Sequence, residues 1–373
     1  MGKLGVGIIG CGNISTTYLE MGPLFAPFEI RGVADIDLEV AEVQGERFDV
    51  PASDVDGLLA RDDIDIVVNL TVPSAHYAVT KSILDAGKHA YSEKPLGLSL
   101  EDVEDMRATA AEAGLRIGSA PDTFLGGSPQ LARRLVDSGE IGTIVAGTCY
   151  VMSHGMEHWH PNPDFFFKPG GGPMLDMGPY YLTTLVHLIG PARRVAALAT
   201  IGTPTRTIGI GPREGETLTV ETPTNIHALV EFDSGATITL STSWDIWAHR
   251  HSEMELYGSD GSLFLPDPNF FGGEVEVAVG DGAITRAEPW GHPFEIPNWG
   301  PGEANYRSAG LADMAAAIEE GRPHRCGVDV AAHTVDLMTA IIRSGETGEF
   351  VDLTTTCSRP APLTPSEASA LLA

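Results

Sequence analysis

The stretch LGVGIIGCGNIS at residues 4–15 decides the fold of the N-terminal part of this chain. Its first six residues form an apolar run, which is typical of a parallel strand buried on both faces. The run leads into a G-x-G-x-x-S turn. There Gly10 permits the sharp change of direction, Gly12 lets backbone approach phosphate groups, and Ser15 is small enough for a following helix to pack on the strand. The stretch therefore predicts a strand–turn–helix unit that binds a dinucleotide.

The residues that follow indicate which dinucleotide. A helix beginning at Asn13 and Ile14 would direct its first amide groups at a pyrophosphate. Asp35 ends the next strand, where a carboxylate accepts hydrogen bonds from the adenosine ribose hydroxyls and repels a 2′-phosphate. Residues 36–39 read IDLE, so no arginine follows closely to bind that phosphate. We expect NAD in preference to NADP; the alternative is that Asp35 only starts a turn.

Strand-like runs and helical patterns alternate as far as about residue 120. The runs lie at 29–34, 64–70, 89–92 and 116–119, and the helical patterns lie at 38–48, 75–86 and 99–113. Such alternation is typical of a parallel sheet with helices on both faces. The sequence therefore predicts an α/β Rossmann domain with a doubly wound parallel sheet over residues 1–121.

After Pro121 the pattern changes. Helical patterns lie at 128–138, 173–189, 306–320 and 329–344, and hairpin turns are expected at DSG (233–235) and SDG (259–261). Consecutive strands joined by hairpins form an antiparallel sheet. We therefore expect residues 122–373 to form an α+β domain for substrate binding and oligomerisation, with a largely antiparallel, open-faced sheet and helices on one face.

The bulk composition narrows the possible partners. A chain of 373 residues with 43% hydrophobic content is long enough for two domains and is typical of globular proteins. Its formal net charge of −28 repels nucleic acid and anionic lipid, so we expect neither nucleic acid nor membrane as a partner. The four cysteines show no C-x-x-C spacing, no signal peptide is evident, and no apolar run is long enough to span a membrane. We expect a cytoplasmic protein.

Two segments carry candidate catalytic side chains. SEKP at residues 92–95 directly follows a strand, and ligands bind beyond the carboxyl ends of the strands in an open parallel sheet. Lys94 could there reach a substrate oxygen above the nicotinamide. GGGPMLDMGPYY at residues 170–181 places Asp176 and Tyr180 four residues apart, on one face of a helix.

These residue types suit the oxidation of a secondary alcohol. The reaction needs a base for the hydroxyl proton while hydride leaves the carbon for the nicotinamide. A free tyrosine, with a pKa of about 10, is a poor base at neutral pH, but a nearby ammonium favours the phenolate. Lys94 beside Tyr180 would supply that charge. The alternatives are an ordinary surface lysine and a tyrosine buried in the core, and Tyr181 has the same claim as Tyr180.

The chain resembles the Gfo/Idh/MocA oxidoreductase family, which includes glucose–fructose oxidoreductase, inositol dehydrogenase and dihydrodiol dehydrogenase. The resemblance covers nearly the whole chain. It rests on the G-x-G turn, the Thr71-Val72-Pro73 and His76 segment, the Glu93-Lys94-Pro95 motif, the GGG…D-x-x-x-(H/Y) segment and the stretches at 317–323 and 344–348. The Glu-Lys-Pro and GGG segments, in this order and spacing, are its most specific part.

The resemblance implies a role for each matching residue. Lys94 would hydrogen-bond the reacting oxygen, Asp176 would hold the substrate and the catalytic geometry, and Tyr180 would stand where many members carry histidine as the general acid/base. Tyrosine occupies this position in the glucose–fructose and dihydrodiol branches, so the departure argues only against the inositol dehydrogenase branch. Cofactor contacts are implied for Thr71, Pro73, His76, Glu93 and Lys94. The Lys94–Pro95 peptide bond is expected to be cis.

The loop HGMEHWH at residues 154–160, which continues to Lys168, is a candidate substrate region. His158 and His160, together with Trp244, could offer polar groups for hydroxyls and an aromatic ring for a sugar face. The alternative for the tryptophan is a place in the core. Clustered histidines can also indicate a metal site, but no fourth ligand is evident, so we expect no metal.

We therefore expect an NAD(P)-dependent oxidoreductase that transfers hydride between nicotinamide and a hydroxyl-bearing carbon of a sugar, polyol or related cyclic diol. Two alternatives stay open. One is redox-assisted glycoside hydrolysis with tightly held NAD, and the other is a catalytically silent ligand sensor of the same fold. An exposed sheet face on the second domain would suit a homodimer or homotetramer, as in relatives.

Overall fold

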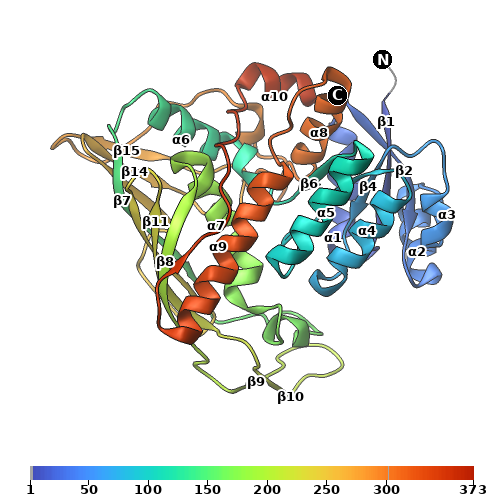
Figure 1. Cartoon of the computed structure of the whole chain (residues 1–373), viewed down its shortest axis with the longest axis horizontal. Helices are drawn as coiled ribbons and strands as arrows, with labels where there is room; N and C mark the ends of the chain where they lie inside the picture. Colours follow the sequence, from blue (N-terminus) through green and yellow to red (C-terminus); the bar gives the residue numbers. More distant parts are fainter. Residues whose placement is uncertain (1–2, 301) are drawn as a thin grey trace.

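The N-terminal part of the computed structural model, which describes residues 3–300 and 302–373, is built on a parallel sheet (Figure 1). Its strands are β1 (Leu4–Ile9), β2 (Phe28–Ala34), β3 (Ala52–Ser53), β4 (Ile66–Asn69), β5 (His89–Ser92) and β6 (Ile117–Ser119), in the order β3-β2-β1-β4-β5-β6. Each neighbouring pair is parallel. The strand order reverses beside β1, which creates the crevice where open α/β sheets bind ligands. The doubly wound sheet expected from the sequence is confirmed.

Helices cover both faces of this sheet. They are α1 (Asn13–Met21), α2 (Leu38–Phe48), α3 (Val55–Leu59), α4 (His76–Asp85) and α5 (Leu100–Ala113). The side chains of Asp37 and Ser99 begin α2 and α5 by accepting main-chain N–H groups. Gly114 ends α5 in the left-handed conformation, with a φ of 66°. Local capping chemistry therefore places these helices where the sequence patterns predicted them.

The second part is built on a larger, mixed sheet. Its strands are β7 (Ile144–Met152), β8 (Ala192–Thr200), β11 (Asn225–Phe232), β12 (Thr237–Ser243), β13 (Met254–Gly258), β14 (Gly261–Leu265), β15 (Glu276–Val279), β16 (Thr285–Arg286) and β17 (Val351–Asp352). Their order is β16-β15-β14-β13-β7-β12-β11-β8-β17. The pairs are antiparallel apart from β7 with β12. Both predicted hairpins, β11–β12 and β13–β14, are confirmed, while a small ribbon of β9 (Thr205–Thr207) and β10 (Thr217–Thr219) lies apart.

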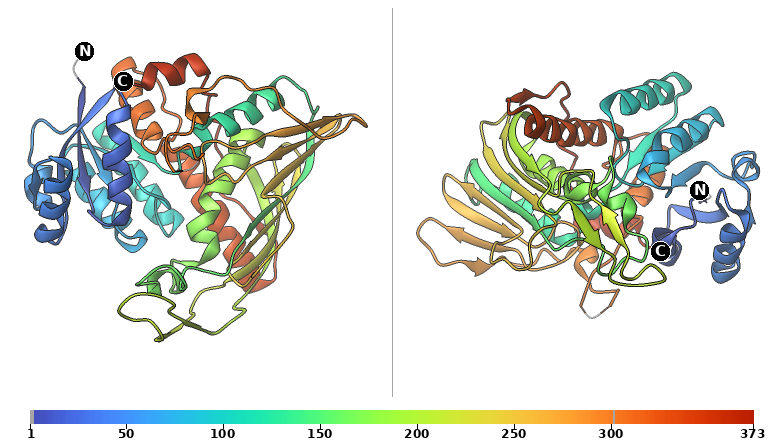
Figure 2. Two further views of the ribbon diagram at one scale, coloured as in Figure 1. Left: turned by 180° about the vertical axis from the view of Figure 1, so that it is seen from behind. Right: turned by 90° about the horizontal axis from the view of Figure 1, so that it is seen from below.

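Helices cover one face of the mixed sheet and leave the other open (Figure 2). The covering helices are α6 (Gly127–Asp137), α7 (Gly172–Ile189) and α9 (Val328–Thr347). Most of α7 is buried, because it lies between the sheet and α9. This burial fixes the helix that carries Asp176 and Tyr180. On the open face Leu198 is 71% exposed and Leu229 is 49% exposed.

The end of the chain returns to the Rossmann sheet (Figure 1). Helices α8 (Ala309–Glu320) and α10 (Pro365–Leu371) share one hydrophobic cluster with β1 and α1. The boundary at residue 121 stays a prediction, but this cluster shows that the later chain completes one face of the first sheet. Helix α8 begins at Ala309 rather than at the predicted residue 306, because Ser308 has a left-handed φ of 90° that a helix interior does not accept.

Candidate active site

A cavity of about 430 Å³ lies where the carboxyl ends of β4 and β5 meet the start of α7. Predicted site residues from both parts of the chain line it together: Ile14, Thr71, Pro73, His76, Glu93, Lys94, Asp176 and Tyr180. The fold therefore brings together residues that are up to 166 positions apart in the sequence, from 14 to 180. The Lys94–Pro95 bond at its floor is cis, as expected.

The glycine turn after β1 is shaped to receive phosphate groups. Gly10 has a φ of 101°, and a Cβ there would lie 2.7 Å from the carbonyl carbon of Leu70. A Cβ on Gly12 would meet nothing within 4 Å among the described residues, so its face is open to a ligand. In the same part of the chain no side chain caps α1, and of the first-turn amides the N–H of Ser15 donates to the Gly12 carbonyl at 3.1 Å, which leaves those of Asn13 and Ile14 for a ligand. The turn therefore fits a dinucleotide pyrophosphate.

Asp35 is held at the end of β2 by backbone. Its carboxylate accepts the N–H of Cys11 at 2.7 Å and the N–H of Asp37 at 3.0 Å. Beside it lies a second, open cavity of about 490 Å³, lined by Cys11, Gly12, Asn13, Thr16, Asp37, Glu39, Val40, Val43, Gln44 and Arg47. Burial and the nearby Asp35 raise the pKa of Cys11 to about 11, so its thiol stays protonated. The carboxylate is thus fixed next to the glycine turn by main-chain hydrogen bonds.

His76 joins two loops instead of serving as a free base. Its Nδ1 lies 2.6 Å from the carbonyl oxygen of Pro95, and its Nε2 lies 3.0 Å from that of Thr71. Burial lowers its pKa below the usual value, against the opposing effect of these two carbonyls. Both ring nitrogens face carbonyl oxygens, which only accept hydrogen bonds, so the nitrogen that carries a proton is the one that donates. The ring therefore fixes the positions of the Thr71 and Pro95 loops.

Lys94 and Asp176 form a close ion pair at the cavity wall. The ammonium donates to Oδ1 and to the main-chain oxygen of Asp176, at 2.8 Å each. The lysine side chain is 15% exposed and the aspartate side chain 21%. Burial lowers the pKa of Lys94, but Asp176, with Tyr180 and Glu93, raises it more, to a value above the usual one. The lysine therefore remains a charged hydrogen-bond donor.

Tyr180 and Tyr181 have different environments. Tyr180 lines the cavity, and the Lys94 ammonium lies over its ring, 5.1 Å from the centroid. Tyr181 instead donates its hydroxyl to Asp267 at 3.0 Å. Burial and this carboxylate raise the pKa of Tyr181 far above its usual value. Of the two tyrosines, Tyr180 is the one placed to meet a ligand.

Several buried polar residues behind the site were missed at the sequence level. Tyr18 donates its hydroxyl to Glu93 at 2.9 Å, and the other oxygen of Glu93 accepts the N–H of Lys94 at 3.0 Å. Asp122 accepts the N–H groups that begin α8, next to Arg307. No sequence signal marks these residues, because each lies far along the chain from its partner.

The loop before α7 contributes an aromatic wall. Phe165, Phe166 and Lys168 line the cavity, and His160 packs edge-on against both rings at 5.6 and 5.4 Å. His158 is exposed and lies outside the cavity lining. Trp244 was expected to contact the substrate, but its side chain is fully buried in an apolar cluster and packs against the ring of Phe166. It therefore belongs to the core.

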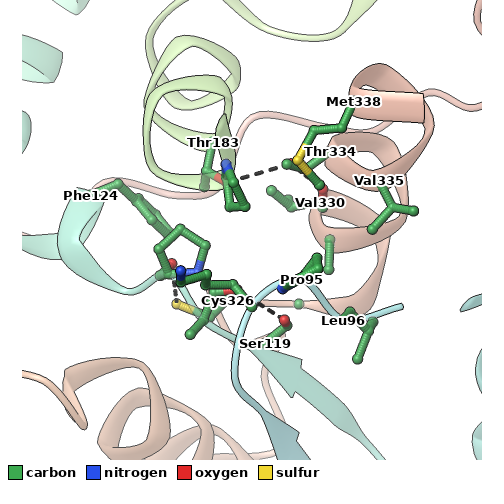
Figure 3. Close-up of a pocket in the computed structure, with 16 residues that line it drawn as sticks. Pro95, Leu96, Ser119, Phe124, Thr183, Cys326, Val330, Thr334, Val335 and Met338 are labelled. Atoms are coloured by element: carbon green, nitrogen blue, oxygen red, sulfur yellow. Dashed lines mark hydrogen bonds between the residues drawn. The ribbon is translucent and has the colours of Figure 1, made fainter. Parts of the chain in front are cut away.

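A second, much smaller cavity of about 20 Å³ lies behind Lys94 and Pro95 (Figure 3). It marks the seam where loops of the Rossmann part pack against α7 and α9. The hydroxyls of Thr183 on α7 and Thr334 on α9 lie 3.4 Å apart beside it. This volume holds about one water molecule, so the side chains behind the Lys94 loop are closely packed.

The chain thus combines a Rossmann turn of open glycine backbone with a cavity lined by Lys94, Asp176 and Tyr180. Residues 4–120 match the family model described as "Oxidoreductase family, NAD-binding Rossmann fold", and residues 130–264 match the "GFO/IDH/MocA C-terminal domain". The chain belongs to the Gfo/Idh/MocA family, and it is an NAD(P)-dependent enzyme acting on CH–OH groups.

Similar proteins agree with this class. The chain is 26% identical to 1,5-anhydro-D-fructose reductase of Ensifer adhaerens, over 81% of this chain and 83% of that protein. It is 24% identical to D-xylose 1-dehydrogenase (NADP(+)) 2 of Haloferax volcanii, over 93% and 99%. In fold it is similar to the apo form of levoglucosan dehydrogenase, with a TM-score of 0.81, 22% identity and coverage of 96% and 100%. Among residues 3–300 and 302–373, no helix has the length and apolarity needed to cross a membrane.

Proposed function

We propose that this enzyme oxidises or reduces one hydroxyl-bearing carbon of a sugar, polyol or related cyclic diol, with NAD as the preferred cofactor. The observation that carries the proposal is the grouping of Lys94, Asp176 and Tyr180 in one cavity beside the glycine turn. When bound, NAD supplies the acceptor for the hydride that leaves the alcohol carbon.

Each of the three residues has a part in this chemistry. The Lys94 ammonium donates a hydrogen bond to the reacting oxygen and stabilises the charge that develops on it. Asp176 holds the ammonium in place through its 2.8 Å contact. Tyr180 takes the hydroxyl proton during oxidation and returns it during reduction. The C–H and O–H bonds of the alcohol break, and the carbonyl π bond forms.

The preference for NAD is supported by local charge. Asp37 and Glu39 line the second cavity, and Asp35 accepts the N–H of its lining residue Cys11, so a 2′-phosphate there would face several carboxylates. Arg47 lies on the same cavity but also faces Glu20, with 3.8 Å between the side-chain nitrogen and oxygen. The ribose hydroxyls of NAD carry no charge and suit this environment better.

A sugar-like substrate is supported by the shape and chemistry of the main cavity. Its volume of about 430 Å³ suits a small molecule. Phe165 and Phe166 offer apolar ring faces, and Lys94 and Lys168 offer donors for hydroxyl oxygens. Proteins of similar sequence include a 1,5-anhydro-D-fructose reductase and a D-xylose dehydrogenase, which by their names act on sugars.

The most direct test is a screen of sugars, polyols and cyclic diols with NAD and, separately, with NADP, followed by absorbance at 340 nm. The proposal predicts net NADH formation with at least one free sugar or polyol. Glycoside cleavage without net NADH would favour redox-assisted hydrolysis instead. Ligand binding without turnover on any member of the panel would favour a silent sensor.

We also infer a homodimer or homotetramer in the cytoplasm, assembled through the open sheet face. Leu198 and Leu229 stand exposed there on adjacent strands, β8 and β11. Burying such side chains is favourable when a second copy covers them. Light scattering of Leu198→Asp should then show dissociation toward a smaller species, and an unchanged mass would remove this face from the interface.

A further inference from the structure

The connection between β8 and β11 is longer than its geometry requires. Thr200 pairs with Asn225, so a turn of about two to five residues could join these antiparallel neighbours. The chain uses residues 201–224 instead, which we call the ribbon segment; it contains β9 and β10 and extends past the end of the mixed sheet (Figure 1 and Figure 2). A connection longer than about 12–15 residues with so little secondary structure is uncommon and usually has a function.

The ribbon segment packs against the part of the chain that forms the aromatic side of the cavity. This part is the turn Asp164–Phe167, which we call the aromatic turn, and two of its residues, Phe165 and Phe166, line the cavity. The last ring, that of Phe167, is fully buried in a small apolar cluster that is distinct from the two larger ones. The members of this cluster are Phe167, Ile208, Leu218, Val220 and Trp244. Most of them belong to the ribbon segment, so its buried apolar side chains support the aromatic turn.

An ion pair and a main-chain hydrogen bond hold the two ends of the aromatic turn. Both terminal nitrogens of Arg213, in the ribbon segment, donate to the carboxylate of Asp164, the first residue of the turn. The two side chains are 32% and 33% exposed, so solvent screens this pair only in part. At the other end the N–H of Glu221 donates to the carbonyl oxygen of Phe167 at 2.8 Å. The ribbon segment therefore fixes the backbone that carries Phe165 and Phe166.

The base of the ribbon segment is fixed separately, by Arg206 on β9. Its side chain is 4% exposed and donates to Glu157 at 2.8 Å and to Asp245 at 2.6 Å. Glu157 lies in the loop before the aromatic turn, and Asp245 lies just after β12. Because this buried group does not involve Arg213, loss of the Arg213–Asp164 pair should loosen the aromatic turn without unfolding the ribbon segment.

We propose that the ribbon segment makes the active site select cyclic sugars over open-chain polyols: through Arg213 and Asp164 it holds the rings of Phe165 and Phe166 where the substrate binds. This inference rests on the proposed function, in which a sugar or polyol occupies the cavity. The C–H face of a sugar ring is rigid and apolar enough to pack on an aromatic ring, while a flexible open chain must first lose conformational freedom. Aromatic rings already held in place increase this difference, because they need no ordering of their own.

Arg213 and Asp164 are positioning residues, because neither is among the described residues that line the cavity. The reacting oxygen is assigned to Lys94 and Tyr180, which are carried by the loop after β5 and by α7. Helix α7 is mostly buried between the mixed sheet and α9, so it does not depend on the Arg213–Asp164 pair. Loosening the aromatic turn should therefore raise KM for a cyclic substrate and leave kcat nearly unchanged.

The test measures kcat and KM with the cyclic sugar that the screen identifies, and the inhibition constant of the open-chain polyol with the same number of carbons. Asp164→Asn and Arg213→Met should each raise KM for the sugar by roughly 3- to 10-fold, the usual effect of a weakened aromatic contact, and change kcat by less than about twofold. The inhibition constant of the polyol should change less than this KM. Arg213→Lys keeps a charged donor and should retain part of the selectivity. The double variant should resemble either single one, because both substitutions remove the same pair.

The matched control is Arg61→Met, which removes a guanidinium that pairs with Asp63 in the Rossmann part and is not among the described residues of the cavity lining. It should leave KM and selectivity unchanged. Three results would overturn the proposal: a wild-type KM in folded Arg213→Met and Asp164→Asn, equal weakening of the sugar and the polyol in these variants, or a kcat that falls as much as KM rises. Equal binding of sugar and polyol by wild type would overturn it as well.

Two further measurements keep the test decisive. If Arg213→Met does not fold, Asp164→Asn and Arg213→Lys decide by the same criteria. If no sugar is turned over, calorimetry of the NAD-bound protein with the same sugars and polyols replaces the kinetics. Selectivity for cyclic sugars that is lost in Asp164→Asn would then support the role of the ribbon segment, while the proposed function fails.

Discussion

At the residue scale, the site depends on which group each charged side chain contacts. Lys94 contacts Asp176, Arg307 contacts amide oxygens, and Glu93 accepts a tyrosine hydroxyl. The identities of Lys94, Asp176 and Tyr180 could be predicted from the sequence because each lies in a short motif. The roles of Tyr18 and Asp122 could not be predicted, because only the tertiary fold brings Tyr18 to Glu93 and Asp122 to the start of α8.

Tyr180→Phe tests the proton carrier. The substitution removes one oxygen and keeps the ring, so the free energy of unfolding should change by about 1 kcal/mol at most. Turnover should fall by roughly 10² or more, the usual effect of losing a positioned acid or base. Tyr180→His should retain more activity, with a pH profile at lower values because histidine titrates lower. Wild-type turnover in Tyr180→Phe would end the assignment.

Asp122→Asn tests the buried carboxylate that accepts the N–H groups of Ser308 and Gly310. Burial is the main cause that raises the pKa of Asp122 from 3.8 to about 6. The folded protein therefore holds this proton more tightly than the unfolded chain, and the free energy of unfolding falls as pH rises from about 4 to 6. Wild type should lose about 2 kcal/mol relative to Asp122→Asn between pH 4 and pH 7. Denaturant unfolding of both proteins at both pH values measures this, and a constant difference would contradict it.

At the element scale, the helices that begin at a local capping residue were predicted best. Helices α2 and α5 begin at the capping residues Asp37 and Ser99, which could be read directly from the sequence. The two-residue strand β3 was missed, because so short a segment has no periodicity. Helix α10 was also missed, although Thr364 and Glu367 form a capping box at its start. The largely antiparallel sheet was predicted correctly, but the parallel pair β7–β12 was not identified, because it joins strands far apart in the chain.

Asp35→Ser tests the junction of β2 with the glycine turn. The variant removes the carboxylate that repels a 2′-phosphate, so the ratio of NADP to NAD affinity should rise. It also removes the acceptor that holds the N–H of Cys11 at 2.7 Å, so NAD affinity itself should fall several-fold. Fluorescence titration with NADH and NADPH measures both effects. Tighter binding of NADPH than of NADH by wild type would show that the cofactor preference is wrong.

At the scale of the whole molecule, the active site exists only because the chain crosses between its two parts. The sequence predicted one domain before residue 121 and another after it. The structure shows α8 and α10 packed into the hydrophobic cluster of β1 and α1. This return could not be predicted, because the apolar faces of α8 and α10 look like those of any helix that packs in the second part.

We propose that Lys94 acts on the reacting oxygen rather than on the pyrophosphate of the cofactor. The most direct test of this proposal compares Lys94→Ala with wild type in NAD affinity and in turnover of the sugar or polyol found by the screen. The matched control is Lys88→Ala, whose ammonium donates to the main-chain oxygen of Arg61 away from the cavity. Lys94→Ala should bind NAD nearly as wild type does and lose roughly 10²–10³ in turnover, as expected for a lost donor to a developing charge. Near-normal turnover in a folded, NAD-binding Lys94→Ala protein would contradict the account.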